Sequence, residues 1–417
     1  MKRRDFIKFS TAAAAAYTMG HSLNSFADSK DIGNVVVILC RGGMDGVAAI
    51  QPMQQSRLQD IRESCYIKTP LKLTADFDLH PKLSNFKSHW DNKNAAAVHA
   101  TGFSYFGRSH FDGQNIMELG SYKPYTMSTG WLGRAMELKN ISSLALNLPT
   151  PIIVSSSAGN ANYYPSKLSL HLAPEKVQVS SAEICTPFGC KEESIVDAAA
   201  TKQLIADQPL RPSTRTSVMA IKALWANDPI LSGFIDETTK SAMNYNSSRD
   251  PRTLAKEVAR QMSLEGGPKV GFIEYSGFDT HSTQGADNGH QAKHLQKVDD
   301  IIRAFSSQSK SVWKKTVIVT VTEFGRTVRQ NGSQGTDHGA ASAILMAGGL
   351  IKQPKVIADW PGLKDKELHE HRDLRETIDA RDVYGDILHH AFDISKAQIR
   401  DIVFPGSKQK LDLGIWG

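Results

Sequence analysis

A buried strand that runs directly into a set of polar side chains is the feature that most constrains what this chain can fold into. Residues 316–322 are rich in β-branched side chains, which is typical of a strand in the interior of a sheet. The strand is followed by Glu323 and Arg326, then by a Gly/Asn/Ser loop, and then by Asp337 and His338. Ligands bind at the carboxyl ends of strands in open α/β sheets, so the segment predicts a functional site as well as a strand.

Three further apolar runs have the same arrangement, each followed by side chains that can bind a metal ion or take part in catalysis. The runs and the residues after them are 34–39 with Asp45, 95–99 with Arg108, Ser109 and His110, and 270–274 with Asp279 and His281. Because the ends of parallel strands meet at one edge of a sheet, these side chains are expected to lie together. Carboxylates and imidazoles suit Zn, Mn, Mg or Ca, and the mixture does not choose among them.

The alternation of strands and helices predicts a three-layer α/β fold, with a mostly parallel sheet covered on both faces. Helices are predicted over 290–305 and 381–392, and another begins at Ser109, a good N-cap with Asp112 three residues later. A change in composition, with more Pro, Ser and Tyr at its start, predicts an inserted cap region around 121–266.

The first residues of the chain have the pattern of an export signal. Arg3 and Arg4 precede a modest apolar region, and small residues near Ala27 suit a cleavage site, so residues 1–27 are predicted to be a twin-arginine signal peptide. A membrane anchor is the alternative, but the apolar stretch is well short of the roughly 20 residues that span a bilayer. The mature domain, 28–417, is therefore expected in the periplasm or otherwise exported, with the twin-arginine machinery as a partner.

The net charge and the cysteines bear on two questions, whether the chain binds nucleic acid and whether it contains a disulfide. The net charge of +6 falls to about +3 without the first 27 residues, which does not favour a nucleic-acid partner. Cys40 ends a predicted core strand and is expected to be a buried thiol. Cys185 and Cys190 flank a short loop, and the sequence leaves open whether they form a disulfide in an oxidising compartment.

Six motifs along the chain resemble one family closely. They read LCRGGMDG, GRSHFDGQNIMELG, STGWLGR, GFDTHSTQ, TEFGRTVRQNGSQGTDHG and RDVYGDIL. Together they resemble the DUF1501 family of exported bacterial proteins, which is placed in the alkaline phosphatase/sulfatase-like superfamily. The resemblance implies an alkaline phosphatase-like version of the predicted α/β architecture.

The resemblance also implies two metal positions. Asp45 and Glu323 resemble the ligands of one metal, and Asp279, His281 and His338 resemble the ligands of a second. The sequence departs from the superfamily pattern where Phe324 follows Glu323 and where only one residue separates Asp279 from His281. These departures leave two metals, one metal and none as alternatives.

The nucleophile of the superfamily lies at the start of the helix after the second core strand, which is the position of Ser109. Backbone N–H groups at a helix start favour an anionic ester, and a metal ion would make the hydroxyl nucleophilic. Arg108 and Arg326 are expected to hold the anion, and His110 to act as general acid toward the leaving group.

Each of these residues also has a purely structural alternative. Ser109 and Asp45 could each be only a helix cap. Glu323 and Arg326 could form a local ion pair, and any single histidine could be a hydrogen-bonded structural residue.

The sequence thus predicts an exported metal-dependent hydrolase of phosphate or sulfate esters. Its substrate would be a small anionic ester or a sulfated or phosphorylated glycan. The alternative is a non-catalytic periplasmic binding or assembly protein on the same scaffold.

Overall fold

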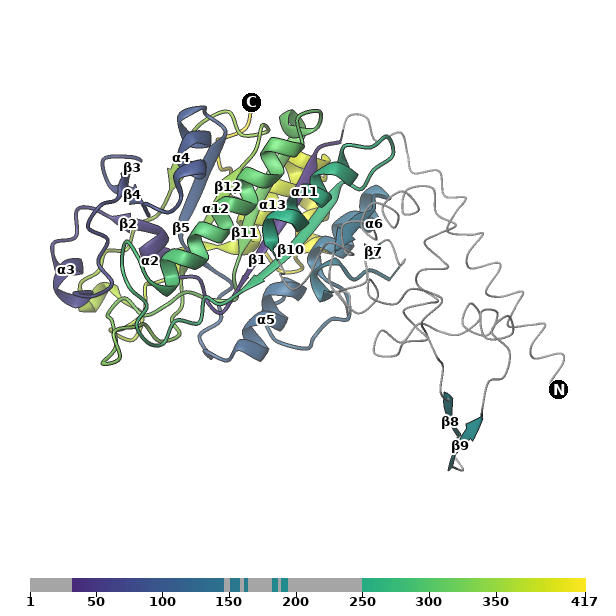
Figure 1. Ribbon diagram of the computed structural model, residues 1–417, viewed down its shortest axis with the longest axis horizontal. Helices are drawn as coiled ribbons and strands as arrows, with labels where there is room; N and C mark the ends of the chain where they lie inside the picture. Colours follow the sequence, from purple (N-terminus) through teal and green to yellow (C-terminus); the bar gives the residue numbers. More distant parts are fainter. Residues whose placement is uncertain (1–31, 146–150, 158–160, 164–181, 187–188, 194–249) are drawn as a thin grey trace, which may run out of the picture. The chain divides into compact units, whose positions relative to one another are not determined.

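The computed structural model of this chain describes residues 32–145, 151–157, 161–163, 182–186, 189–193 and 250–417 (Figure 1). The predicted signal peptide, 1–27, lies outside the described residues. The chain divides into a main body, Asp28–Leu146 with Thr150–Tyr163 and Asp250–Gly417, and a second unit. In the second unit the described residues form one hairpin, β8 (Ala182–Thr186) with β9 (Gly189–Glu193). Cys185 and Cys190 are register partners in this hairpin, and their pairing as a disulfide stays a prediction.

The main body is built on one large sheet that is parallel except at a single strand. The strands in spatial order are β13 (Val356–Ile357), β5 (Ala95–Gly102), β12 (Ser342–Ala347), β11 (Thr316–Val321), β1 (Asn34–Arg41), β10 (Val270–Ser276), β6 (Ser143–Ala145) and β7 (Ala161–Tyr163), with β14 (Ile378–Asp379) also paired to β5. Only β12 runs antiparallel to its neighbours β11 and β5. The predicted mixed α/β fold with a mostly parallel sheet is confirmed.

The central strands form because their sequences are almost continuously apolar. In β1 every residue from Asn34 to Cys40 is buried, as is every residue of β11. A strand that packs against helices on both faces needs apolar side chains at successive positions, which is what Val, Ile and Leu supply here. The four predicted strands are all present, and each of β1, β5 and β10 runs two or three residues beyond its apolar run.

Helices cover both faces of the sheet, which gives the three layers that the sequence predicted (Figure 1). One face carries α4 (Ser84–Asp91), α11 (Pro251–Met262) and α12 (His290–Gln308). The other carries α5 (His110–Leu119), α6 (Trp131–Lys139) and α13 (Ala380–Phe392), whose buried residues share one core cluster with the alternate side chains Val35, Val37 and Leu39 of β1. Alternation of side chains along the strand assigns neighbouring residues to opposite layers.

Part of the predicted insertion belongs to the main body. Strands β6 and β7 extend the large sheet from β10, and α11 packs against it, although all three lie within 121–266. The second unit is accordingly narrower than the predicted cap region.

The remaining elements are short. A small sheet in the order β2 (Ile50–Pro52), β4 (Phe77–Leu79), β3 (Leu71–Lys72) lies between β1 and β5 in the chain. None of the helices in the described part of the chain combines the length and the apolar character needed to cross a bilayer. The other helical turns are α2 (Gly46–Ala49), α3 (Arg57–Ile61), η1 (Ile152–Val154), η3 (Trp313–Lys315), η4 (Asp365–Glu367), α14 (Lys396–Gln398) and η5 (Ile399–Val403).

Candidate active site

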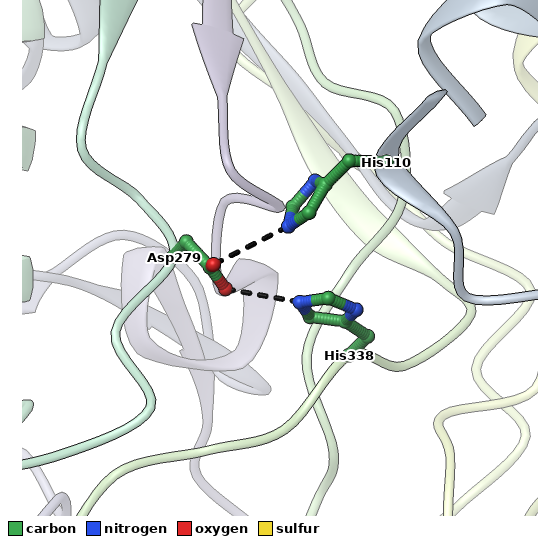
Figure 2. Close-up of side chains that lie close together, drawn as sticks. All are labelled: His110, Asp279 and His338. Atoms are coloured by element: carbon green, nitrogen blue, oxygen red, sulfur yellow. Dashed lines mark hydrogen bonds and ion pairs between the residues drawn. The ribbon is translucent and has the colours of Figure 1, made fainter. Parts of the chain in front are cut away.

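The segments that follow β5, β10 and β11 meet at one edge of the large sheet, as the sequence predicted. His110 begins α5 after β5, Asp279 and His281 follow β10, and His338 precedes the antiparallel strand β12. Figure 2 shows His110 and His338 directed at the carboxylate of Asp279. Residues that are far apart in the chain therefore form one cluster.

Asp279 is the centre of this cluster. Its Oδ1 atom lies 2.9 Å from His281 Nε2 and 3.0 Å from His338 Nε2, and its Oδ2 atom lies 3.3 Å from His110 Nε2. The cluster thus presents three imidazole Nε2 atoms to one carboxylate. The ligand atoms of His110, Asp279 and His338 all lie within 4.8 Å of one another, a spacing that one metal ion can span.

Each of the three imidazoles has its other ring nitrogen beside an acceptor oxygen. His110 Nδ1 lies 2.8 Å from Glu323 Oε1, and His281 Nδ1 lies 3.1 Å from Asp337 Oδ1. His338 Nδ1 lies 2.8 Å from the backbone oxygen of Arg108. With a metal ion beside Asp279, an oxygen at this position would hold the proton on Nδ1 and leave the Nε2 lone pair to the ion, which is how metal-binding histidines are oriented in proteins.

The donor set fits a metal ion on two further observations. His110 Nε2 is buried and faces Asp279 Oδ2 at 3.3 Å, an ion pair only when His110 is protonated. The Nε2 atoms of His281 and His338 lie 3.0 Å apart, and with both protons on Nδ1 the two atoms would have no hydrogen to share. A cation next to Asp279 would satisfy all three nitrogens at once.

Arg326 sets the electrostatics of Asp279. Its buried guanidinium donates to Asp279 Oδ1 at 2.7 Å and to the backbone oxygen of Gly42 at 3.2 Å. Burial alone would raise the pKa of Asp279, but the hydrogen bond and charge of Arg326, together with His338 and His281, bring it below its usual value. Asp279 therefore stays ionised, as a metal ligand must be.

The two histidines of Figure 2 respond differently to their surroundings. The hydrogen bond to Glu323 raises the pKa of His110, with the charge of Asp279 acting in the same direction. Burial lowers the pKa of His338. The carboxylates of Glu323 and Asp279 on either side of His110 favour a positive charge on its ring. That charge is either a second proton on the imidazole or a metal ion that takes the place of the proton.

Glu323 contacts the cluster through His110, on the side of the imidazole ring away from Asp279. It is 1% exposed, and its Oε1 atom accepts from the backbone N–H of Gly42 at 2.8 Å and from Gln114 Nε2 at 3.2 Å as well as facing His110. Burial would raise the pKa of Glu323, yet these hydrogen bonds lower it. In this position Glu323 orients His110 through the second ring nitrogen. No ion pair joins it to Arg326 among the described residues, and Arg326 pairs with Asp279.

Asp45 lies one step away from the cluster. It is fully buried, caps α2 through the N–H of Ala48 at 3.2 Å, and pairs with Arg62 Nη1 at 2.6 Å. Its Oδ2 atom also accepts from Gln284 Nε2 at 2.7 Å, and Gln284 in turn bonds to Thr336 beside Arg326. Both carboxylate oxygens of Asp45 have protein partners. Asp45 is therefore a helix cap and ion-pair partner, which was the alternative to its predicted role as a metal ligand.

Arg108 is held by carboxylates. Its guanidinium donates to Asp373 Oδ2 at 2.9 Å and to Glu370 Oε2 at 2.5 Å. Its backbone has a φ of 57°, the left-handed conformation, which is uncommon for a residue with a side chain. The structure therefore places the predicted anion-binding side chain in an ion pair, and it is the backbone oxygen of Arg108 that contacts the cluster, through His338.

Ser109 occupies the N-cap position of α5, as predicted, but its side chain makes no capping bond. Its backbone N–H donates to the hydroxyl of Tyr105 at 3.1 Å. The Ser109 hydroxyl has no hydrogen-bond partner within the described ranges, and the next residue, His110, belongs to the cluster.

Sequence reasoning missed two contributions to this site. It assigned His110 to proton transfer, whereas the structure places it among the potential metal ligands. It did not assign a role to Asp337, which orients His281 and is itself held by Asn331 Nδ2 at 3.0 Å. The adjacency of Asp337 to His338 was a visible signal, because acidic neighbours often orient ligating imidazoles.

Comparison with known proteins identifies one sequence family. Residues 230–403 match the family described as "Protein of unknown function (DUF1501)", which confirms the resemblance over that part of the chain. No curated protein matches the sequence.

Several solved structures are similar to this chain at low sequence identity. A protein in the alkaline phosphatase superfamily from Vibrio parahaemolyticus is 10% identical, with 83% of this chain and 71% of that chain covered and a TM-score of 0.34. Murine ectonucleotide pyrophosphatase/phosphodiesterase 5 is 10% identical, with 87% of this chain and 96% of that chain covered and a TM-score of 0.36. The PsFucS1 sulfatase from Pseudoalteromonas sp. is 10% identical, with 92% of this chain and 71% of that chain covered and a TM-score of 0.31. At such identities and TM-scores below 0.5, the likeness identifies neither a substrate nor site residues.

Proposed function

We propose that this chain is a metal-dependent hydrolase of phosphate or sulfate esters. The observation that carries the proposal is the set of three imidazoles whose Nδ1 atoms face oxygens of Glu323, Asp337 and Arg108, with their Nε2 atoms directed at Asp279. Such orientation by outer partners is typical of a metal centre.

His110, Asp279 and His338 would hold the metal ion, with His281 beside them. Two imidazoles and a carboxylate favour a transition metal such as zinc or manganese over magnesium or calcium, which prefer oxygen ligands. When bound, the ion would supply Lewis-acid polarisation of the ester and would lower the pKa of the attacking hydroxyl.

The protein groups around the metal position have separable tasks. Arg326 keeps Asp279 ionised and fixed, and Glu323 keeps His110 in one orientation. The ten-residue helix α5 begins at His110, so its N-terminus lies at the cluster, where the helix dipole favours an anionic group. Ser109, immediately before it, is the proposed nucleophile because its hydroxyl is not used as a cap.

The proposal is tested by metal content and by activity on generic esters. The purified full chain is expected to contain divalent metal and to hydrolyse an aryl phosphate or an aryl sulfate. Activity should be lost with a chelator and recovered with zinc or manganese. A chain that binds no metal and turns over neither ester, with or without added metal, would rule the proposal out.

Ser109→Ala separates a nucleophile from a cap. Because the Ser109 side chain makes no capping bond, its removal should cost less than the roughly 1 kcal/mol of an ordinary N-cap, while turnover of the ester found above should collapse. Ser104→Ala is the matched control, since Ser104 donates to Glu376 at 2.9 Å in the same loop and should affect stability more than turnover. Near-normal turnover of Ser109→Ala would shift the assignment to Thr101, whose buried hydroxyl makes no hydrogen bond within the described ranges.

A non-catalytic binding or assembly protein is the second candidate. One observation favours it: both arginines expected to hold an anion are already paired, Arg108 with Asp373 and Glu370, and Arg326 with Asp279. This candidate predicts that neither ester is hydrolysed, whether or not metal is bound, which the same measurements distinguish.

Substrate class and location complete the proposal. We take the substrate to be a small anionic ester or a sulfated or phosphorylated glycan, and the protein to be exported by the twin-arginine pathway. Arg3 and Arg4 support export, and replacement of both by Lys should leave unprocessed precursor in the cytoplasm. Normal processing of that double variant would contradict it.

A further inference from the structure

We infer that a second divalent metal ion binds Asp386, His390 and Asp412, on the opposite edge of the sheet from the candidate active site. The ligand atoms of these three residues all lie within 4.8 Å of one another. Asp386 and His390 lie four residues apart on α13, and Asp412 belongs to the C-terminal segment. The end of α13 is next to the start of β1, since Gly33 N–H donates to the oxygen of Ala391 at 2.7 Å.

The carboxylate of Asp386 carries the inference, because only one of its oxygens accepts a hydrogen bond. Asp386 is 1% exposed, and its Oδ2 atom accepts from the indole of Trp416 at 2.7 Å and from the N–H of Leu413 at 3.2 Å. Its Oδ1 atom is buried and has no hydrogen-bond partner within the described ranges. A buried carboxylate oxygen that accepts no hydrogen bond is costly, and a cation at coordination distance would offset that cost.

The surroundings of this oxygen place an imidazole and a second carboxylate within reach. His390 Nε2 lies 3.8 Å from Asp386 Oδ1, and the His390 ring stacks on Trp416 at a centroid distance of 5.0 Å. Asp412 is exposed and uses one oxygen to accept from the N–H of Gly414 at 2.9 Å. One imidazole with two carboxylates suits zinc or manganese.

Lys396 is the competing source of positive charge. Its Nζ atom lies 3.6 Å from Asp386 Oδ1, beyond hydrogen-bond distance, and donates instead to the backbone oxygen of Leu411 at 2.9 Å. Two carboxylates and one ammonium leave a net negative charge at this position. A divalent ion would therefore tie the C-terminal segment to α13 more strongly than Lys396 does.

The test uses the full chain with His338→Ala, which weakens the candidate active site, stripped of metal and titrated with zinc chloride. One equivalent of zinc is expected to bind, with a change in tryptophan fluorescence that Trp416→Phe removes. Adding His390→Gln should weaken this binding at least tenfold. His389→Gln is the matched control, because His389 lies beside it but faces the backbone oxygen of Ile394 at 2.8 Å, and it should leave zinc binding unchanged.

Lys396→Gln distinguishes a metal ion from an ammonium counter-ion. If zinc binds, removal of the competing charge should tighten zinc binding. A lowered melting temperature with no gain in zinc affinity would overturn the inference, and so would zinc binding that His390→Gln does not affect. Both outcomes are independent of ester hydrolysis and of metal at Asp279.

Discussion

His338→Ala is expected to remove the metal ion from the candidate active site and, with it, the stabilisation of the fold by that ion. A ligand that binds only the folded state adds about 2.7 kcal/mol at a concentration a hundredfold above its dissociation constant. Chelation should therefore lower the melting temperature of the unmodified chain by roughly 5 °C more than that of the variant, which keeps only the metal position at Asp386. Ester turnover should fall by more than the roughly 10- to 100-fold that loss of an outer partner of a metal ligand costs.

The comparison within each protein, with and without chelator, cancels the cost of the substitution itself. His290→Ala is the control, because His290 is exposed at the first position of α12 and should keep the full chelator effect. An equal chelator effect in His338→Ala and the unmodified chain would show that the stabilising metal lies elsewhere. If elemental analysis finds no metal in the unmodified chain, the result would favour the second candidate function, a non-catalytic binding or assembly protein.

The fold was accessible from the sequence because its strands are marked by composition. Runs such as 34–39 and 316–322 are too apolar and too β-branched to lie anywhere except inside a sheet, and β1 and β11 are found there. Parallel order then brings their ends to one edge, which is why Asp279, His281 and His338 could be grouped in advance.

The partners of each side chain could not be predicted in the same way. Arg108 was expected to face an anion, but it contacts Asp373, which is 265 residues away in the chain. Glu323 was expected to bind metal, but its Oε1 atom contacts His110 and the backbone N–H of Gly42. Contacts of this kind depend on rotamers and on loops that pack only in the folded protein, and periodicity in the sequence carries no record of them.

Asp45→Ala is expected to destabilise the fold by about 3–5 kcal/mol, because it leaves the guanidinium of Arg62 buried without a counter-ion. The Arg62 side chain is 1% exposed, and its remaining partners are the backbone oxygens of Val328 at 2.7 Å and Thr327 at 2.8 Å. The loss should appear in urea unfolding of metal-free protein as well as of metal-loaded protein. A difference that appears only with metal would make Asp45 a ligand, as the sequence first predicted.

A double variant separates the ion pair from the space that it fills. Replacement of a buried ion pair by apolar side chains of similar volume is often neutral or stabilising, whereas loss of one partner is not. Asp45→Leu with Arg62→Met should therefore recover at least about half of the free energy of unfolding lost in Asp45→Ala. Because Gln284 and Thr336 stand between Asp45 and Arg326, the double variant should also retain metal at Asp279. Loss of that metal would show that the buried pair positions the active site and does not merely stabilise the sheet edge beneath it.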